Sequence, residues 1–417
     1  MDDSKLAYDQ SLAALTAAGS DFETITRTID GVDYTVYKNA PSSLQHVYTA
    51  ATAHGDKEFI VFEGERFTFN DFFRQAWALA DALSTRHGIV RGDRVGIAMR
   101  NYPEWLSAYV AITSMGAVAV PINSWGLAPE LLFAVRDSEC RSVFCDQQRF
   151  DLMAEGLAES NINAVVARPA PDNTLQPGQS LHEFIAGSEN ATAPGVDIDS
   201  EDIAMIMYTS GTTGKPKGAV STHRALCQAL MNFDCTAIAS AMANPELIGA
   251  MLSKGFEPAQ MLAVPLFHVS GLHAVFLTAL RGGRKIVMMY KWDAVKALQL
   301  IEQERITVLS VAPSMMLQVL ESPEFDDYDT SSLSSLGAGG SATPAKVSAL
   351  MREKVSNMYG GTGWGLTETN SIGTAFTGKA FVDNPGSAGF CHATVEVKAC
   401  DDDGQPLPAG TPGRLWI

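Results

Sequence analysis

The chain has 417 residues, which is too long for one compact core and indicates two or three substructures. Hydrophobic residues make up 46% and charged residues 18%, a composition that fits a soluble globular protein and excludes a disordered one. The 30 Lys and Arg residues against 47 Asp and Glu residues give a net charge of −17, which disfavours binding to nucleic acid or to an anionic membrane surface. An anionic small substrate would need a local nest of backbone donors or a bound cation.

The first residues, MDDSKLAYDQ, lack a basic region followed by an apolar stretch, so they predict no secretory signal. The longest uncharged stretch, Trp105–Pro129, contains Gly116, Pro121 and several hydroxyl side chains. It predicts a helix followed by a buried strand rather than a membrane span. Six scattered cysteines without a CxxC pair indicate reduced core thiols and a cytoplasmic location. They are Cys140, Cys145, Cys227, Cys235, Cys391 and Cys400.

Strand and helix patterns alternate along the first half of the chain. We expect a hairpin across Gly64, followed by a helix that Asn70 caps and that runs towards Arg86. Pro103 and Pro129 are each typical of the first turn of a helix. The expected strands are Glu58–Glu63, Arg66–Phe69, Arg94–Met99, Ala117–Pro121 and Ser142–Cys145. Repeated strand–helix units favour a mostly parallel sheet with helices on both faces.

Residues 167–200 are rich in Pro, Gly, Asn, Asp and Ser, which predicts a surface connection. The alternation then resumes, with helices predicted over Asp293–Glu304 and from Thr343-Pro344 onwards. The expected strands are Ile203–Tyr208, Met261–Val264, Lys285–Met289 and Thr307–Val311. After Pro385, short segments with Asp-Gly and Pro-Gly turns indicate a small β-rich module.

These patterns predict four regions in the chain. The predicted boundaries give an N-terminal extension at 1–40, a first α/β subdomain at 41–200, a second at 201–384 and a β-rich segment at 385–417. The last residues, Gly413–Ile417, resemble a β-strand rather than a polar tail. An apolar strand needs a partner, so we expect the natural protein to continue beyond it.

The segment YTSGTTGKPKG at residues 208–218 follows an expected strand and is the strongest chemical signal in the chain. Its three glycines, four Ser and Thr hydroxyls and two lysines supply the donors and positive charge that a polyphosphate needs. The segment is no Walker A loop, because Thr209 stands where that motif has glycine and Pro216 follows Lys215. By composition alone, a surface turn is an equally good interpretation.

The complete eleven-residue segment resembles, at every position, the signature of the AMP-forming adenylate synthetases, which include acyl-CoA synthetases, aryl-CoA ligases, luciferases and peptide-synthetase adenylation domains. The resemblance covers roughly Ser42 to Ile417. It implies two α/β subdomains with mostly parallel sheets and a small β-rich, distorted-barrel subdomain. In that family the loop embraces the β- and γ-phosphates of ATP. The positions that carry over are Thr209, Ser210, Gly211, Thr212, Thr213, Gly214 and Lys217.

A second motif, Trp364-Gly365-Leu366-Thr367-Glu368-Thr369, resembles the family's aromatic-Gly-Leu-Thr-Glu sequence. An aromatic face can stack on adenine, a threonine can donate to the α-phosphate, and a glutamate can hold Mg²⁺. The resemblance therefore implies that Trp364, Gly365 and Thr367 bind ATP, and that Thr367 and Glu368 are catalytic, with Glu368 as metal ligand. The family more often has Tyr at position 364. Taken alone, the motif fits a core Trp, a capping Thr and a solvated Glu.

Two further segments resemble walls of the family's binding site. Gly339, Gly340 and Ser341 follow an expected strand, and small residues there let a ligand lie close to the backbone. The resemblance implies that they border adenine and the acyl group, Gly339 serving both. Gly363 precedes Trp364, and the small residues around it suggest a roomy acyl pocket that suits a bulky ring or a long chain.

His268, in Pro265-Leu266-Phe267-His268, matches a family position that borders the acyl site. A lone histidine in an apolar segment is more often a core residue. The resemblance instead implies substrate positioning and gating.

The resemblance implies two half-reactions. A carboxylate attacks the α-phosphate of ATP to give an acyl-adenylate and pyrophosphate, and the thiol of coenzyme A then displaces AMP. The family's ribose-binding aspartate, hinge and C-terminal lid with its lysine would lie beyond Ile417. We therefore expect these 417 residues alone to be impaired. A homodimer is common for such folds.

Two alternatives remain. An amino-acid-activating domain that transfers to a carrier protein would need a carboxylate near the acyl site, and residues 266–280 contain none. We therefore favour a fatty or aromatic acid. The other alternative is a nucleotide- or acyl-binding domain with little activity.

Overall fold

The computed structural model describes residues 3–171, 174–209, 216–355, 359–384 and 386–417. The chain folds into two compact units, each assembled from separate stretches of sequence. The predicted boundaries at 41, 201 and 385 remain predictions. The first unit comprises Met1–Ala40, Gln228–Glu257 and Ala294–Ile417, and the second unit comprises Pro41–Cys227 and Pro258–Asp293.

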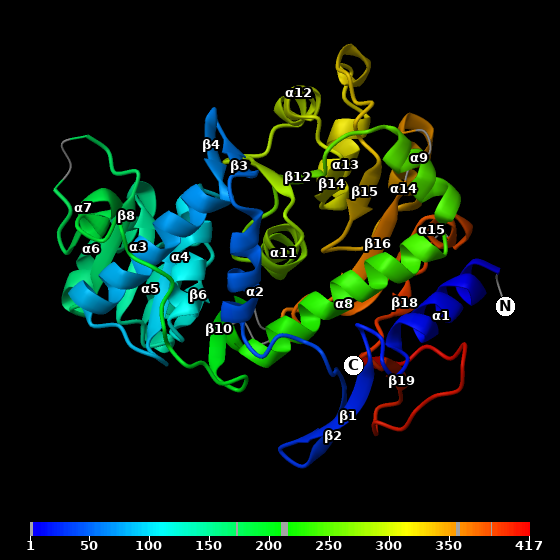
Figure 1. The fold of residues 1–417 in the computed structure, drawn as a ribbon, viewed down its shortest axis with the longest axis horizontal. Helices are drawn as coiled ribbons and strands as arrows, with labels where there is room; N and C mark the ends of the chain where they lie inside the picture. Colours follow the sequence, from blue (N-terminus) through cyan, green and yellow to red (C-terminus); the bar gives the residue numbers. More distant parts are fainter. Residues whose placement is uncertain (1–2, 172–173, 210–215, 356–358, 385) are drawn as a thin grey trace. The chain divides into compact units, whose positions relative to one another are not determined.

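A seven-stranded sheet organises the second unit (Figure 1). Its strands run in the order β11-β10-β6-β5-β7-β8-β9, and every pair is parallel except the antiparallel edge pair of β10 and β11. The strands are β5 (Arg94–Ala98), β6 (Val118–Pro121), β7 (Ser142–Asp146), β8 (Asn163–Ala167), β9 (Gly178–Ser180), β10 (Ile203–Thr209) and β11 (Lys217–Thr222). The mostly parallel α/β architecture predicted from the sequence is confirmed.

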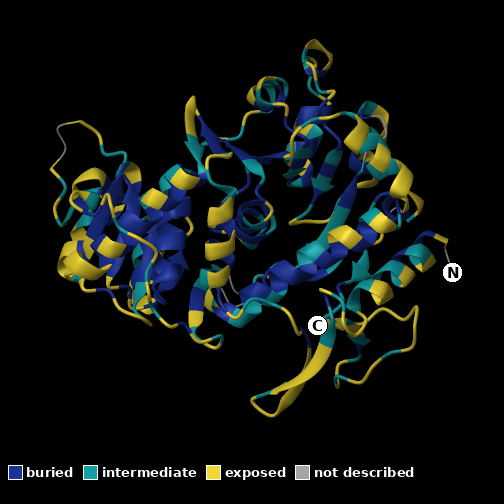
Figure 2. Ribbon diagram, viewed as in Figure 1, coloured by how far each residue is buried: buried dark blue, intermediate teal, exposed yellow. Residues whose placement is uncertain are grey.

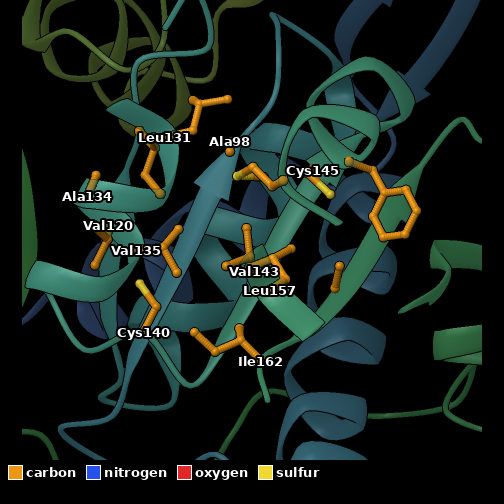
Figure 3. Packing of buried hydrophobic residues seen from close by; sticks show 14 of the residues in the cluster. Ala98, Val120, Leu131, Ala134, Val135, Cys140, Val143, Cys145, Leu157 and Ile162 are labelled. Atoms are coloured by element: carbon orange, nitrogen blue, oxygen red, sulfur yellow. The ribbon is translucent and has the colours of Figure 1, made fainter. Parts of the chain in front are cut away.

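Helices bury this sheet because their apolar positions recur at helical spacing. They are α3 (Phe69–His87), α4 (Pro103–Ser114), α5 (Ala128–Asp137) and α6 (Gln147–Glu159). Figure 3 shows the core between β5, β7 and the α5–α6 side, where Val135, Val143 and Leu157 are fully buried. Every α4 residue except Glu104 is buried. Among the described residues, no helix is long and apolar enough to cross a membrane.

The start of α3 differs from the prediction. Thr68, not Asn70, caps this helix, because its hydroxyl accepts from the Asp71 N–H at 3.1 Å while the Asp71 carboxylate accepts from the Thr68 N–H at 3.1 Å. This reciprocal capping box satisfies two N–H groups that have no partner within the helix. The Asn70 amide instead donates to the Asp56 carboxylate at 2.8 Å.

The predicted surface connection at 167–200 also contains regular structure. It includes the short strand β9 and the helix α7 (Leu181–Ile185). Ser180 and Glu183 form a second capping box there, with the Ser180 hydroxyl accepting from the Glu183 N–H at 3.2 Å. The Pro- and Gly-rich composition of the segment hid this local signal.

Four further strands of the second unit lie in the order β12-β13-β3-β4. The predicted hairpin of β3 and β4 is confirmed, and Gly64 adopts a φ of 90° in its turn. The elements here are α2 (Leu44–Ala51), the 3₁₀ turn Thr52–His54, β3 (Glu58–Phe62), β4 (Glu65–Thr68), β12 (Ala259–Leu262), α10 (Val269–Gly271), a π-helical turn Leu272–Leu277, α11 (Thr278–Arg281) and β13 (Lys285–Met288).

Five strands of the first unit run in the order β18-β17-β16-β15-β14. The first three in chain order, β14 to β16, are parallel, whereas β17 and β18 join antiparallel. The elements are α12 (Ala294–Glu304), β14 (Val308–Val311), α13 (Pro313–Leu320), the 3₁₀ turn Phe325–Asp327, β15 (Ser335–Ala338), α14 (Ala345–Lys354), β16 (Gly361–Gly365), β17 (Gly373–Thr377), α15 (Lys379–Asp383) and β18 (Phe390–Cys391).

The N-terminal residues belong to the first unit. The strands β1 (Thr24–Ile29) and β2 (Val32–Tyr37) form a hairpin whose residues are mostly exposed, as Figure 2 shows. At its base, Tyr37 is buried and its hydroxyl donates to Asn232 at 2.9 Å. The remaining elements are α1 (Asp3–Thr16), α8 (His223–Met242), α9 (Pro245–Ser253), β19 (Lys398–Cys400) and β20 (Arg414–Trp416). The cysteines are free thiols, and all but Cys391 are buried.

Candidate functional site

The glycine- and hydroxyl-rich segment connects the antiparallel strands β10 and β11. Thr209 ends one strand, Lys217 begins the other, and the two residues pair with each other. This hairpin differs from the strand–loop–helix of a P-loop, in which helix N–H groups face the phosphates. Lys217, which is exposed, is therefore the donor that the described part of this segment offers to a phosphate. Five predicted positions, Ser210, Gly211, Thr212, Thr213 and Gly214, lie outside the described residues.

The base of this hairpin is closely packed. A Cβ atom on Gly218 would lie 2.7 Å from Cγ2 of Ile206, so any larger residue there would force that side chain to shift. The Tyr208 hydroxyl donates to the Asp137 carboxylate at 2.6 Å, and burial raises the pKa of Tyr208. The hairpin is thus held to α5 on one side while its tip carries the loop.

The second motif begins on β16, which pairs with β17. Trp364 is half-buried and lies opposite Thr374, and its ring covers Gly373. A Cβ atom on Gly373 would come within 2.8 Å of the ring atom Cε3 of Trp364. A Cβ on Gly365 would lie 2.4 Å from the backbone of Ser371. Two glycines therefore let the strands approach and fix the aromatic face that the sequence predicts as an adenine platform.

Thr367 and Glu368 lie in a tight turn between β16 and β17. The Asn370 N–H donates to the backbone carbonyl of Thr367 at 3.1 Å, and the Ser371 N–H donates to the backbone carbonyl of Leu366 at 2.9 Å. Asn370 and Ser371 both have positive φ angles, 54° and 69°. Few non-glycine residues adopt this conformation, and such residues are often found at functional sites.

The Glu368 side chain is exposed, and none of the described residues forms a hydrogen bond or ion pair with it. Its carboxylate oxygens are therefore available to an outside cation. Mg²⁺ in nucleotide sites is commonly held by one or two carboxylates together with substrate phosphates and water, so this residue suits such an ion.

Gly339 follows β15, and Gly363 lies on β16, the neighbouring parallel strand. β15 ends at Ala338, which pairs with Thr362 of β16, and the Thr362 hydroxyl donates to the Ala338 oxygen at 2.8 Å. A Cβ atom on Gly339 would lie 3.9 Å from the Gly363 oxygen, an ordinary van der Waals contact, with nothing closer. Gly340 follows with a φ of 81°, and Gly340 and Ser341 are exposed. The predicted wall residues thus share the carboxyl end of two neighbouring strands, where ligands bind in α/β sheets.

His268 follows β12 and precedes α10. The residue is exposed, although the surrounding protein desolvates the charged ring enough to lower the pKa of His268. Its ring lies 4.6 Å from that of Phe267, which is buried against Trp125 at 5.3 Å between ring centroids. These contacts hold His268 at the surface of the second unit rather than in its core.

The structure assembles the predicted residues in two groups. Gly339, Gly340, Ser341, Gly363, Trp364, Gly365, Thr367 and Glu368 lie on β15, β16 and the connections that follow them in the first unit, whereas Thr209, Lys217 and His268 belong to the second. Sequence reasoning missed Gly373 beneath Trp364 and Asn101 beside the His268 segment. Asn101 had one available signal, its place just after a buried strand.

Curated relatives support the resemblance. The sequence profile of the family described as AMP-binding enzyme matches residues 47–417. 4-Coumarate–CoA ligase 1 of Petroselinum crispum is 28% identical over 371 residues, which cover 87% of this chain and 65% of that protein. Long-chain-fatty-acid–CoA ligase of Bacillus subtilis (strain 168) is 28% identical over 399 residues, which cover 88% and 67%. The chain thus spans about two thirds of the length of these relatives.

Solved structures support the same resemblance. The inhibitor-bound N-terminal domain of FACL13 from Mycobacterium tuberculosis matches with a TM-score of 0.70 and 26% identity, over 88% of this chain and 86% of that one. Apo MatB from Rhodopseudomonas palustris matches in fold with a TM-score of 0.73 and 24% identity, over 89% and 69%. The predicted resemblance is confirmed by the match over 47–417, and the chain belongs to the AMP-binding enzyme family.

Proposed function

We propose that the protein is an AMP-forming carboxylate–CoA ligase, which activates a carboxylic acid with ATP and transfers the acyl group to coenzyme A. The observation that carries this proposal is the family match over residues 47–417, which includes both the 208–218 segment and the Trp364–Thr369 motif. The names of the curated relatives, 4-coumarate–CoA ligase and long-chain-fatty-acid–CoA ligase, support the same reaction class.

In the first half-reaction, a carboxylate oxygen of the acid attacks the α-phosphorus of ATP, and the bond from that phosphorus to pyrophosphate breaks. This step mainly needs positioning and charge neutralisation at phosphorus. We assign the β- and γ-phosphates to the 209–214 loop and Lys217. Trp364 would stack on adenine, and the Thr367 hydroxyl would donate to the α-phosphate. With a net charge of −17 on the chain, ATP binding must depend on these local donors.

A magnesium ion would be held by Glu368, whose exposed carboxylate has no partner among the described residues. When bound, such an ion neutralises charge on phosphate oxygens. The chain's own part is to present this carboxylate from the strained turn at 366–371. Because that turn is closed by backbone hydrogen bonds, it would hold the backbone at Thr367 and Glu368 in a fixed conformation.

The acid that we favour is apolar, either aromatic or fatty. Residues 266–280, which follow β12 and include His268, contain no Asp or Glu that could pair with a substrate ammonium group. Gly339 and Gly363 carry no side chains, which favours a bulky acyl group beside them. These observations argue against an amino-acid-activating domain that transfers to a carrier protein.

We further propose that the 417 residues alone carry out the first half-reaction slowly and form thioester poorly. The support is that the chain spans only 65% of the length of the Petroselinum crispum relative. A longer version of the protein would then release AMP faster with coenzyme A than this chain does.

Carboxylate-dependent exchange of pyrophosphate into ATP tests the proposal, with 4-coumarate, octanoate and leucine as substrates. We expect exchange with 4-coumarate or octanoate and none with leucine. The exposed Lys217→Met variant should fold normally and lose at least tenfold of the exchange rate. Exchange with leucine but with neither other acid would overturn the proposed substrate class. Exchange that needs no added acid would overturn the proposed reaction.

A further inference from the structure

Asn101 contacts the segment that carries His268, although the two are far apart in sequence. It lies just beyond the carboxyl end of β5, in the seven-stranded sheet, whereas the segment follows β12 in the other sheet of the same unit. The Asn101 Nδ2 donates to the Val264 oxygen at 2.9 Å, and the Leu266 N–H donates to the Asn101 Oδ1 at 3.1 Å. The Asn101 side-chain amide thus links the segments that follow β5 and β12, two strands of different sheets.

This contact satisfies the backbone groups of Val264 and Leu266. Asn101, Val264 and Leu266 are all buried, so an unpaired N–H or C=O there would carry the cost of desolvation. Pro265 between them has no N–H, and its oxygen accepts from the His268 N–H at 3.2 Å. The amide therefore takes the place of a neighbouring strand for residues 264 and 266.

The remaining residues of the segment have little conformational freedom. A Cβ atom on Gly271 would lie 2.3 Å from the Pro265 oxygen, so the chain folds back tightly after His268. Phe267 is buried with its ring edge-on to Trp125, and the Arg100 guanidinium lies 5.6 Å from the same indole ring. Arg100, the neighbour of Asn101 in sequence, thus lies against the indole on which Phe267 packs.

We propose that Asn101 is a positioning residue that holds Val264–His268 in place and thereby controls which acyl groups the enzyme accepts. This rests on the proposed function, in which His268 borders the acyl group. Asn101 does not touch substrate itself. Its loss would shift His268 and change the KM for the carboxylate, while the KM for ATP would stay the same.

Amide hydrogen exchange of Leu266, in protein labelled with ¹⁵N-leucine, tests the structural half of the proposal. We expect Asn101→Ala to accelerate that exchange at least tenfold, because the acceptor of this N–H is lost. Asn101→Asp keeps an oxygen acceptor for this N–H, so it should lose less of the protection than Asn101→Ala.

Steady-state kinetics of pyrophosphate exchange by the 417-residue chain test the functional half of the proposal. We expect Asn101→Ala to raise the KM for the carboxylate at least tenfold and to leave the KM for ATP within twofold. Asn244→Ala is the matched control, because Asn244 is equally buried and bridges the Ser240 oxygen and the Lys379 N–H elsewhere. It should lower the melting temperature without changing Leu266 exchange or either KM.

The outcomes separate the two proposals. Unchanged Leu266 exchange in Asn101→Ala, or equal effects of Asn244→Ala, would overturn the positioning role. Changed exchange with an unchanged carboxylate KM would overturn the control of acyl selection. Wild-type protein that shows no pyrophosphate exchange with any acid would contradict the proposed function, and acyl selection with it, while Leu266 exchange would still decide whether Asn101 holds the segment.

Discussion

Gly373 lies directly beneath the ring of Trp364. A Cβ atom at position 373 would stand 2.8 Å from Cε3 and 3.1 Å from Cζ3 of the indole, and 2.4 Å from the Trp364 backbone oxygen. The two residues come from neighbouring antiparallel strands, β16 and β17. The orientation of the proposed adenine platform therefore depends on a glycine nine residues further along the chain.

Gly373→Ala should destabilise the protein and weaken nucleotide binding together. The added methyl group meets backbone and ring atoms that cannot both move aside, and overpacking of this kind typically costs about 1–3 kcal/mol. Chemical denaturation and calorimetry with AMP would measure the two effects. Gly339→Ala is the control, because its new Cβ would meet only the Gly363 oxygen, at 3.9 Å. Unfolding free energy in that variant should change by less than about 0.5 kcal/mol.

Glu368→Gln should abolish magnesium-dependent pyrophosphate exchange without affecting folding. The side chain is exposed and has no described partner, so the neutral amide removes no internal contact. We expect at least a hundredfold loss of exchange at saturating ATP and an unchanged melting temperature. Full activity of this variant at low magnesium would show that Glu368 is not the metal ligand.

Stability should fall as the pH is lowered from about 6.5 to about 4, in part because of His223. Burial lowers the pKa of His223 to about 4, and its Nδ1 accepts from the Leu44 N–H at 3.2 Å, so the ring stays neutral in the folded protein. The unfolded chain takes up this proton near pH 6.5, which favours unfolding in that window. Burial also lowers the pKa of His392 to about 4 and that of His273 to about 3, and both act in the same direction.

His223→Asn would test this assignment, because asparagine keeps an acceptor near the Nδ1 position but does not titrate. Urea midpoints at pH 7, 5.5 and 4.5 should fall less steeply for the variant than for the wild type. Parallel pH dependences would mean that His223 contributes nothing to acid sensitivity.

Tyr37→Phe should destabilise the protein by about 1–2 kcal/mol, the usual cost of leaving a buried hydrogen-bonding group unpaired. The Tyr37 hydroxyl is buried and donates to Asn232 Oδ1, whose amide is also buried. Tyr34→Phe is the control, since Tyr34 is 49% exposed on the hairpin. Denaturation curves that coincide for the two variants would argue that the N-terminal hairpin is not anchored through Tyr37.

Much of the fold was predictable because its signals are local. Pro103 begins α4, Gly64 turns the hairpin of β3 and β4, and apolar runs give the buried parallel strands. The two local errors have a common cause. Thr68-x-x-Asp71 and Ser180-x-x-Glu183 both form capping boxes, but neighbouring Asn70 and the surrounding Pro and Gly residues gave competing signals.

The site was only partly predictable because some contacts depend on topology. The motifs identify Trp364, Thr367 and Glu368, whose spacing along the chain is short. Gly373 gains its role only once β17 folds back on β16. Asn101 gains its role only when two sheets bring it to Val264 and Leu266, more than 160 residues away. No pattern within a short stretch of sequence carries that information.

The most direct test of the proposed function is exchange of labelled pyrophosphate into ATP by the 417-residue chain, with magnesium and with 4-coumarate or octanoate. We predict exchange that depends on the acid and on magnesium, and that falls at least tenfold in Lys217→Met. Exchange that is absent with every acid from a folded, AMP-binding protein, or that is equal in wild type and Lys217→Met, would contradict it.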